Sequence, residues 1–143
     1  MVNYSSGSGG STLTFNYTIA SGHVSSDLDY KATSSLALNS GSIKDAAGNA
    51  AILTLASPGA TNSLGANKAL VVDGVLPTVS SVTSTTGNGT KKVGDVIAIT
   101  ITFSENVTVS GTPQLTLETG GTDAVVNFSS GSGGTTLTFN YTI

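Results

Sequence analysis

The stretch VNYSSGSGGSTLTFNYTI, at Val2–Ile19, returns near the other end of the chain as VNFSSGSGGTTLTFNYTI, at Val126–Ile143. Two positions differ between the copies: Tyr4 against Phe128 and Ser11 against Thr135. Similarity at a fixed spacing is the sign of a repeat array, and the spacing here is 124 residues. A chain of 143 residues therefore contains one repeat period and an overlap.

Each copy is predicted to form a β-hairpin. The glycines of SSGSGG, at residues 5–10 of the first copy, supply the positive φ angles that tight turns require. Strict alternation follows, with apolar side chains on one face of the strand and threonine or asparagine on the other. The apolar face of the two copies comprises Leu13, Phe15, Tyr17, Ile19, Leu137, Phe139, Tyr141 and Ile143. These side chains are expected to point inward, and they would carry any contact between chains that pair through their hairpins.

The rest of the chain has the composition of short strands and polar turns. Glycine, serine, threonine, valine and alanine dominate while glutamate, arginine and glutamine are scarce, which predicts an all-β fold with almost no helix. The segment DVIAITITF at residues 95–103 alternates like the hairpin strands, and NVTVSGTPQLTLETG at 106–120 holds two short strands broken at Gly111 and Pro113. Further strands are predicted at Tyr30–Leu38, Ala51–Leu55, Lys68–Val72 and Thr78–Thr83.

Several classes of function are not expected from this sequence. Five lysines and no arginine against eight carboxylates argue against binding to nucleic acid, which requires a dense basic surface. No apolar run approaches the roughly 20 residues of a membrane-spanning helix. An enzyme is not expected, because cysteine is absent and the serines lack a nucleophile motif with a partner base. His23, the only histidine, is expected in an exposed loop rather than as a ligand.

The stretch ASPGATNSLGANKALVVDGVLPTV, at residues 56–79, is predicted to contain the boundary between repeats, because it carries two of the three prolines. Residues 1–72 are then interpreted as the later strands of one repeat and residues 73–143 as the earlier strands of the next. Together they amount to about one domain plus the duplicated hairpin, at 2–19 and 126–143. Met1, directly before a strand pattern, looks like a cut into a longer protein.

Four segments carry a resemblance to a known family. They are DGVLPTVSSV (73–82), GDVIAITITFSENVTVSGTPQLTL (94–117), TLTFNYTIASGHVSSDLDY (12–30) and IKDAAGNAA (43–51). In these segments the chain resembles the bacterial immunoglobulin-like repeats of very large secreted surface proteins and adhesins, of the kind that also occurs beside repeats-in-toxin sequences. The resemblance covers nearly the whole chain, but in circularly permuted order.

The resemblance implies an immunoglobulin-like antiparallel β-sandwich, built here with strands from two successive repeats that are either permuted within one chain or donated between chains. It implies an extracellular place on a bacterial cell surface and a non-enzymatic role as a stiff spacer behind an adhesive tip, with calcium stiffening the junctions. The implied partners are neighbouring repeats or identical chains and, through the parent protein, a surface glycan or another cell-surface target.

Two groups of side chains are candidates for Ca²⁺, a hard cation that takes roughly six to eight oxygen ligands. With an ordinary up-and-down alternation of strands, one pole of the sandwich gathers four of them: Asp45, Asn49, Asp73 and Glu105. Asp27 and Asp29, in SSDLDY, are the candidates at the other pole and resemble the acidic turn at the junctions of cadherin-like repeats. A structural role is the alternative, since an aspartate commonly caps its own turn.

Three explanations account for the matching ends. In the first, the chain is cut from an array at an arbitrary point. In the second, the early and late strands close within one chain as a circular permutant, with Pro58–Leu76 as the returning linker. In the third, residues 73–143 of one chain complete their sandwich with residues 20–72 of the next, which gives a self-assembling head-to-tail fibre.

A glycan-binding module is a further alternative, because exposed tyrosines can stack on sugar rings. Tyr17 and Tyr141 are predicted on the inward face of their strands, so packing in a core explains them better. Tyr30, after DLD, is predicted to be a corner tyrosine whose hydroxyl bonds back to a loop.

Overall fold

The computed structural model describes all 143 residues and divides into two compact units, a first unit of Met1–Leu76 and a second unit of Pro77–Ile143. The fold is mostly β, every strand pair is antiparallel, and one short helix is present. The division falls inside residues 56–79, the stretch in which the sequence predicts a boundary between repeats. The assignment of the two units to successive repeats stays a prediction.

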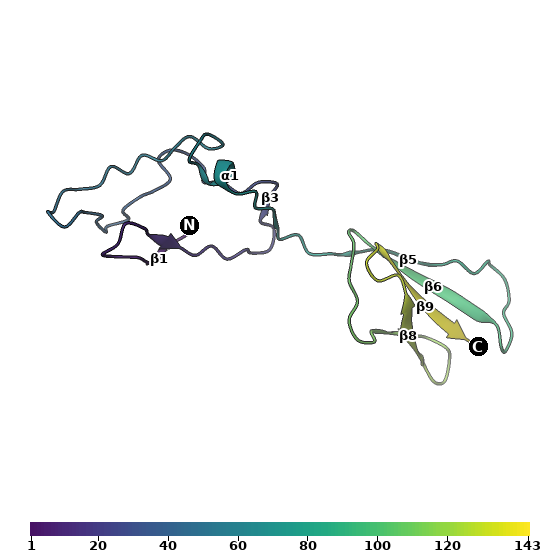
Figure 1. Ribbon diagram of the computed structural model, residues 1–143. Helices are drawn as coiled ribbons and strands as arrows, with labels where there is room; N and C mark the ends of the chain where they lie inside the picture. Colours follow the sequence, from purple (N-terminus) through teal and green to yellow (C-terminus); the bar gives the residue numbers. More distant parts are fainter. The chain divides into compact units, whose positions relative to one another are not determined.

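The second unit is a five-stranded antiparallel sheet that curls into half of a barrel (Figure 1). The strands lie in the order β5-β6-β9-β8-β7, so the hairpin β8–β9 is inserted between β6 and β7. Their bounds are β5 (Val79–Ser84), β6 (Val96–Phe103), β7 (Gln114–Leu117), β8 (Ala124–Ser130) and β9 (Thr136–Thr142).

The core of the second unit is only partly covered. Val126, Leu137 and Phe139 are its buried members. Nine further apolar side chains pack against them but remain partly exposed: Ile99, Ile101, Phe103, Val107, Val109, Leu115, Leu117, Phe128 and Tyr141. A single sheet leaves one side of such a core open, whereas a second packed layer would close it.

The first unit has short strands and almost no core. The hairpin of β1 (Tyr4–Ser6) and β2 (Thr14–Phe15) and the pair of β3 (Val24–Ser25) with β4 (Val72–Asp73) form two separate two-stranded sheets. The helix α1 (Leu64–Asn67) precedes β4. Val72 and Ser63 are the buried residues of this unit, so hydrogen bonds rather than apolar packing hold most of it together.

The predictions of secondary structure are confirmed mainly in the second unit. The strands predicted at 78–83 and 95–103 correspond to β5 and β6, and the two glycine-rich hairpins form at the predicted places. Of the two strands predicted in 106–120 only the second forms, as β7. The backbone of Val107 bonds instead to Gly133 and Gly134 of the hairpin turn, which turns this segment away from a regular ladder.

Three predicted strands of the first unit are wrong. Tyr30–Leu38 and Ala51–Leu55 are irregular, and of Lys68–Val72 only Val72 is in a strand, in β4. Their apolar alternation is real, but a strand requires a neighbour that accepts and donates hydrogen bonds along its length. Here a bond from the Leu55 amide to the carbonyl of Thr33, at 2.9 Å, joins the first two segments.

The helix α1 is not predicted by the sequence pattern. Ser63 caps it, because the Ser63 hydroxyl accepts a hydrogen bond from the Ala66 amide at 3.1 Å, and the side chain is completely buried. The Lys68 amide closes the helix on the carbonyl of Leu64. With four residues, α1 is far too short to cross a membrane, and the chain has no other helix that could do so.

Candidate functional site

The two copies of the hairpin adopt the same local conformation in different surroundings. In the first hairpin (residues 2–19) Tyr4 pairs with Phe15, and in the second hairpin (residues 126–143) the equivalent Phe128 pairs with Phe139. Both aromatic pairs have ring centroids 6.2 Å apart and an interplanar angle of 75°. Because two separate environments give the same geometry, the hairpin residues themselves specify it.

Glycine is essential in the turn of each hairpin. Gly7 has a φ of 110° and Gly131 a φ of 107°, in the region that residues with a side chain rarely adopt. A Cβ atom on Gly7 would lie 2.0 Å from the Thr12 carbonyl oxygen, and one on Gly131 would lie 2.1 Å from that of Thr136. Any larger residue would therefore open the turn of that copy.

Burial distinguishes the two copies. Leu137 and Phe139 of the second hairpin are 6% and 4% exposed. In the first hairpin Phe15 is 41% exposed and Ile19 is 50% exposed. The apolar face predicted to point inward is thus buried in one copy and open in the other, and for Tyr17, which is 38% exposed, the prediction of core packing is wrong.

The neighbouring strands explain this difference. In the second unit β9 pairs with β6 over seven residue pairs and β8 pairs with β7 over four. In the first unit β1 and β2 pair only with one another, over two residue pairs. The first hairpin therefore has two unpaired strand edges and an uncovered apolar face, which is the usual starting point for pairing with another strand.

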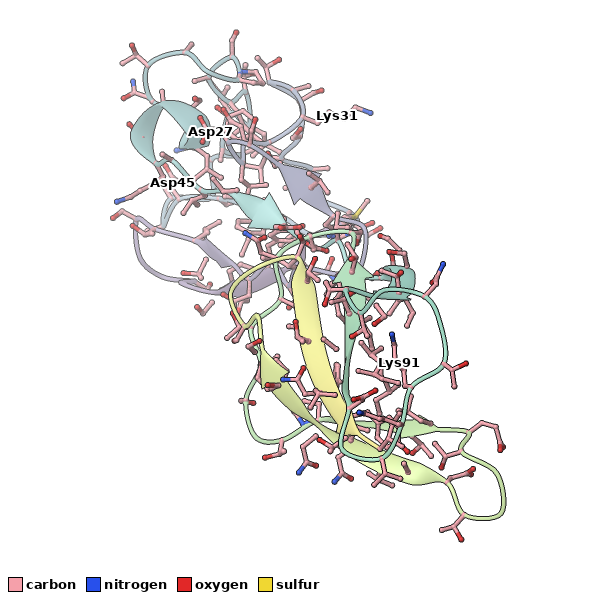
Figure 2. All side chains as sticks on the ribbon, turned by 90° about the vertical axis from the view of Figure 1, so that its right-hand side faces the viewer. Asp27, Lys31, Asp45 and Lys91 are labelled. Atoms are coloured by element: carbon pink, nitrogen blue, oxygen red, sulfur yellow. The ribbon has the colours of Figure 1, made fainter.

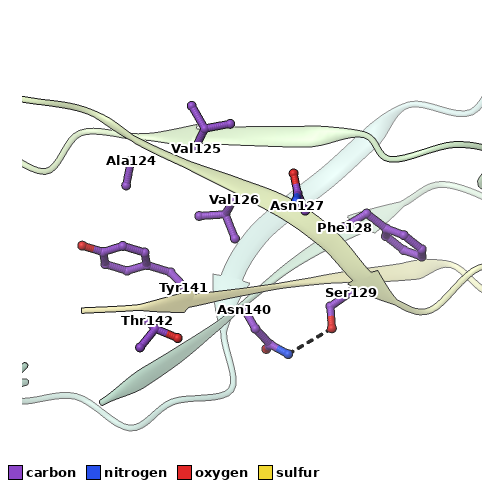
Figure 3. A pocket seen from close by; sticks show the side chains of 9 residues that line it. All are labelled: Ala124, Val125, Val126, Asn127, Phe128, Ser129, Asn140, Tyr141 and Thr142. Carbon is purple, nitrogen blue, oxygen red and sulfur yellow. Dashed lines mark hydrogen bonds between the residues drawn. The ribbon is translucent and has the colours of Figure 1, made fainter. Parts of the chain in front are cut away.

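A groove lies where β8 and β9 diverge in the second unit (Figure 3). The two strands pair at Phe128–Phe139 and Ser130–Thr138 and then separate, leaving an open groove of about 430 Å³. Its walls are Ala124–Ser129 and Asn140–Thr142, with a hydrogen bond from the Asn140 amide to the Ser129 hydroxyl, at 3.0 Å, at one end. These walls carry no carboxylate, lysine or histidine side chain.

Asp27 and Asp29, one of the predicted calcium pairs, come together beside α1. Oδ2 of Asp29 and Oδ2 of Asp27 would lie 3.0 Å and 3.4 Å from a Cβ atom on Gly65, and Figure 2 shows Asp27 next to the helix. Asp29 is already used by the fold, since its carboxylate accepts hydrogen bonds from the amides of Tyr30 at 2.8 Å and Gly59 at 3.0 Å. Partial burial raises the pKa of Asp29, but hydrogen bonds from Gly59, Tyr30, Gly65 and Ser63 outweigh it and hold the pKa below its usual value.

The first unit is expected to loosen in acid because of Asp29. A carboxyl group whose pKa is lower in the folded chain stabilises the fold above its ordinary pKa of about 3.9, and this contribution is lost as the pH falls through the lowered value. Between pH 5 and pH 2 the Gly59 amide should lose its protection from hydrogen exchange several-fold. Asp29→Asn should abolish this pH dependence at Gly59; protection that persists to pH 2 in the original chain would contradict it.

The other predicted calcium group has three members in the first unit and one, Glu105, in the second. Asp45 binds Asn49 across its own turn, through the Asn49 backbone and side-chain amides at 2.8 Å each, and this side-chain bond is the main cause of its lowered pKa. Asp73 accepts a bond from the Val75 amide at 3.1 Å, and Glu105, in the second unit, has a buried Oε1 without a hydrogen-bond partner. No group of three or more His, Asp or Glu side chains is placed to hold a metal ion. Calcium binding stays a prediction.

Two tyrosines of the first unit have defined polar partners. The Tyr30 hydroxyl donates a hydrogen bond to the Ala56 carbonyl at 2.7 Å, which confirms the prediction that it bonds back to a loop. The Tyr17 hydroxyl lies 2.6 Å from Nδ1 of His23, and the two rings stack at 5.7 Å. His23 itself is exposed, as predicted, and Tyr141, the counterpart of Tyr17, packs against the core of the second unit.

The duplicated hairpin is therefore the best candidate for a functional site, and what it offers is strand pairing and apolar contact. Residues 2–19 present the same face that residues 126–143 bury. Comparisons of the chain with protein-family models, with curated proteins and with solved structures give no match.

Proposed function

We propose that this chain is a non-enzymatic structural module of a bacterial extracellular surface protein, an immunoglobulin-like β-sandwich that acts as a stiff spacer in an array of repeats. In the array each sandwich runs from about residue 73, through the hairpin, to about residue 72 of the following period. The observation that carries the proposal is the hairpin that occurs twice, 124 residues apart, with one geometry and two degrees of burial.

What each unit lacks supports this assignment. The second unit has the hairpin β8–β9 together with the strands that precede it in the chain, β5, β6 and β7, but its core side chains are not covered by a second layer. The first unit has the hairpin and the residues after it, with half-buried apolar side chains such as Leu28, Leu53 and Leu55 but no sheet to receive them. Residues 20–72 placed against the second unit would supply the second layer that a sandwich requires.

The exposed aromatic side chains favour this role over glycan binding. Tyr4, Phe15 and Tyr17 are 48%, 41% and 38% exposed and could be taken for a sugar-stacking surface. Their counterparts in the second hairpin, Phe128, Phe139 and Tyr141, belong to the core of the second unit. Their exposure is therefore better explained by missing neighbour strands than by a ligand.

A tandem array of repeats in native order tests the spacer function. Chains of one, two and three periods, each running from residue 73 through 143 and then from 20 to 72, should give a maximum dimension in small-angle X-ray scattering that grows by a constant step of roughly 30–40 Å per repeat. A flexible chain would instead grow with about the square root of its length. If calcium stiffens the junctions, a chelator should shorten the arrays; square-root growth with and without calcium would refute a stiff spacer.

A further inference from the structure

We propose that the first hairpin of one chain takes the place of the second hairpin in another copy of the same chain, so that copies join head to tail. This deepens the proposed function by naming a partner, a second copy, and the site that receives it, the position between β6 and β7. The second unit itself demonstrates that this position accepts the hairpin sequence, because β8–β9 occupies it.

The incoming hairpin would reproduce the contacts of the resident one from Val126 onward, which leaves out the pairs of Ala124 with Leu117 and of Val125 with Thr116. Leu13 and Phe15 would replace Leu137 and Phe139, which are identical in type and buried. The two differing positions are harmless: Thr135 is exposed, so serine fits there, and the hydroxyl that Tyr4 adds is satisfied within its own hairpin by the Ser8 amide at 2.9 Å. Replacing the resident hairpin by the incoming one should therefore change the free energy of these side-chain contacts little.

The residues that follow the hairpin favour the exchange. An incoming first hairpin brings residues 20–72 with it, in the order in which they follow the hairpin in a repeat. Their half-buried apolar side chains, Leu28, Leu53 and Leu55 among them, can then cover the nine partly exposed core side chains of the second unit. Burial of apolar surface on both partners is the gain that drives the exchange.

The linker between the units argues for a second copy rather than the same chain. Much of Pro58–Leu76, the segment that closure within one chain would need to be free, is held in the first unit by α1, by the β3–β4 pair and by a bond from the Gly74 amide to the His23 carbonyl at 2.8 Å. From Gly74 to Thr78, where pairing with Ser104 begins, the backbone can span about 14 Å.

The distance to be spanned is longer than this linker. In the second unit the hairpin ends beside Asp95, to which Ile143 is bonded, whereas β5 begins beside Phe103 at the other end of β6. Asp95 and Ser104 are about 30 Å apart along the strand. The β3–β4 pair keeps Gly74 beside His23, close to the end of the first hairpin. A chain that inserted its own hairpin with this pair intact would have to cover most of the length with the short linker, while a hairpin from another copy is free of that restraint.

The contact so formed is heterologous. Each chain has one first hairpin to donate and one position between β6 and β7 to receive it, and these are different surfaces. Heterologous contacts that do not close on themselves extend into chains of copies. The expected product is therefore a linear assembly that depends on protein concentration.

Disulfide trapping in the full chain tests the proposal, since the chain has no cysteine of its own. Ala98 of β6 is the register partner of Asn140, and Asn16 is the equivalent of Asn140 in the first hairpin. The variant with Ala98→Cys and Asn16→Cys should form a ladder of covalent oligomers on oxidation, because paired residues of antiparallel strands lie at a distance that suits a disulfide. The control with Ala98→Cys and Asn140→Cys should give a cross-linked monomer.

A pair of glycine variants gives opposite expected results. Gly7→Ala opens the turn of the donated hairpin and should reduce the oligomer mass measured by light scattering at least several-fold. Gly131→Ala weakens the resident hairpin, so oligomers should form at a lower protein concentration than in the original chain. A cross-linked monomer from the Asn16 variant would overturn the choice of a second copy, and no cross-link would overturn the exchange itself. Neither result would contradict the spacer function, which the tandem arrays test separately.

Discussion

A chain re-ordered to run from residue 73 through 143 and then from 20 to 72 is expected to unfold in one cooperative transition, with a free energy of unfolding higher by on the order of 5 kcal/mol than that of the present chain. In the present chain the core of the second unit is partly exposed and the first unit buries little more than Val72 and Ser63. Joining the two parts in native order lets each cover the other without exchange between copies.

The magnitude follows from the number of side chains that would be covered. Full burial of one large apolar side chain contributes about 1.5–3 kcal/mol, and nine core side chains of the second unit are only partly buried now. The ordering of residues 20–72 opposes this gain through lost conformational entropy, which is why the net value is a fraction of the sum.

Urea denaturation followed by circular dichroism measures this result at a protein concentration low enough to keep both chains monomeric. The present chain is the control, because it contains every residue of the re-ordered chain in a different order. Two separate transitions in the re-ordered chain, or a stability equal to that of the present chain, would mean that residues 20–72 do not form the second layer of a sandwich.

Phe139→Ala is expected to destabilise the second unit by about 3–5 kcal/mol, whereas the matched Phe15→Ala should cost less than about 1 kcal/mol in the monomer. Phe139 is 4% exposed and packs with Val126 and Leu137 at the centre of the sheet, so its removal leaves a cavity. Phe15 occupies the same place in the same local sequence but is 41% exposed, so its removal takes much less apolar surface out of a packed core.

Urea denaturation of the two variants, with tyrosine fluorescence as a second probe because tryptophan is absent, measures the difference. At high protein concentration Phe15→Ala should also weaken association between copies, because Phe15 then takes the position of Phe139. Equal costs of the two substitutions at low concentration would mean that the first hairpin is buried within its own chain, and would favour the circular permutant.

The hairpins and the strands β5 and β6 could be predicted because their signals are local. Glycines that need a positive φ mark the turns, and strict alternation marks the strands. The same alternation wrongly predicts strands at Tyr30–Leu38 and Ala51–Leu55, where the apolar pattern is present but no neighbouring strand is. The cap of α1 by Ser63 was missed because its helix is a single turn with a glycine in it, for which the sequence signal is weak.

Among the candidate calcium ligands, too, the contacts that form are local ones. Asp27 and Asp29 do converge, as residues so close in sequence can, but the structure uses Asp29 to join Tyr30 and Gly59. Asp45 and Asn49 are local partners across one turn. A calcium cage would also need distant residues such as Glu105, and no spacing in the sequence specifies such a meeting.

By itself the sequence determined the repeat period, the mostly β character and the shape of each hairpin, because these depend on residues within a few positions of one another. The tertiary structure alone decided which copy is buried. Phe15 and Phe139 have the same neighbours in sequence, yet β6 and β7 flank only the second hairpin. Burial is a property of distant strands that pair and pack, so two nearly identical sequences can differ in what their side chains contact.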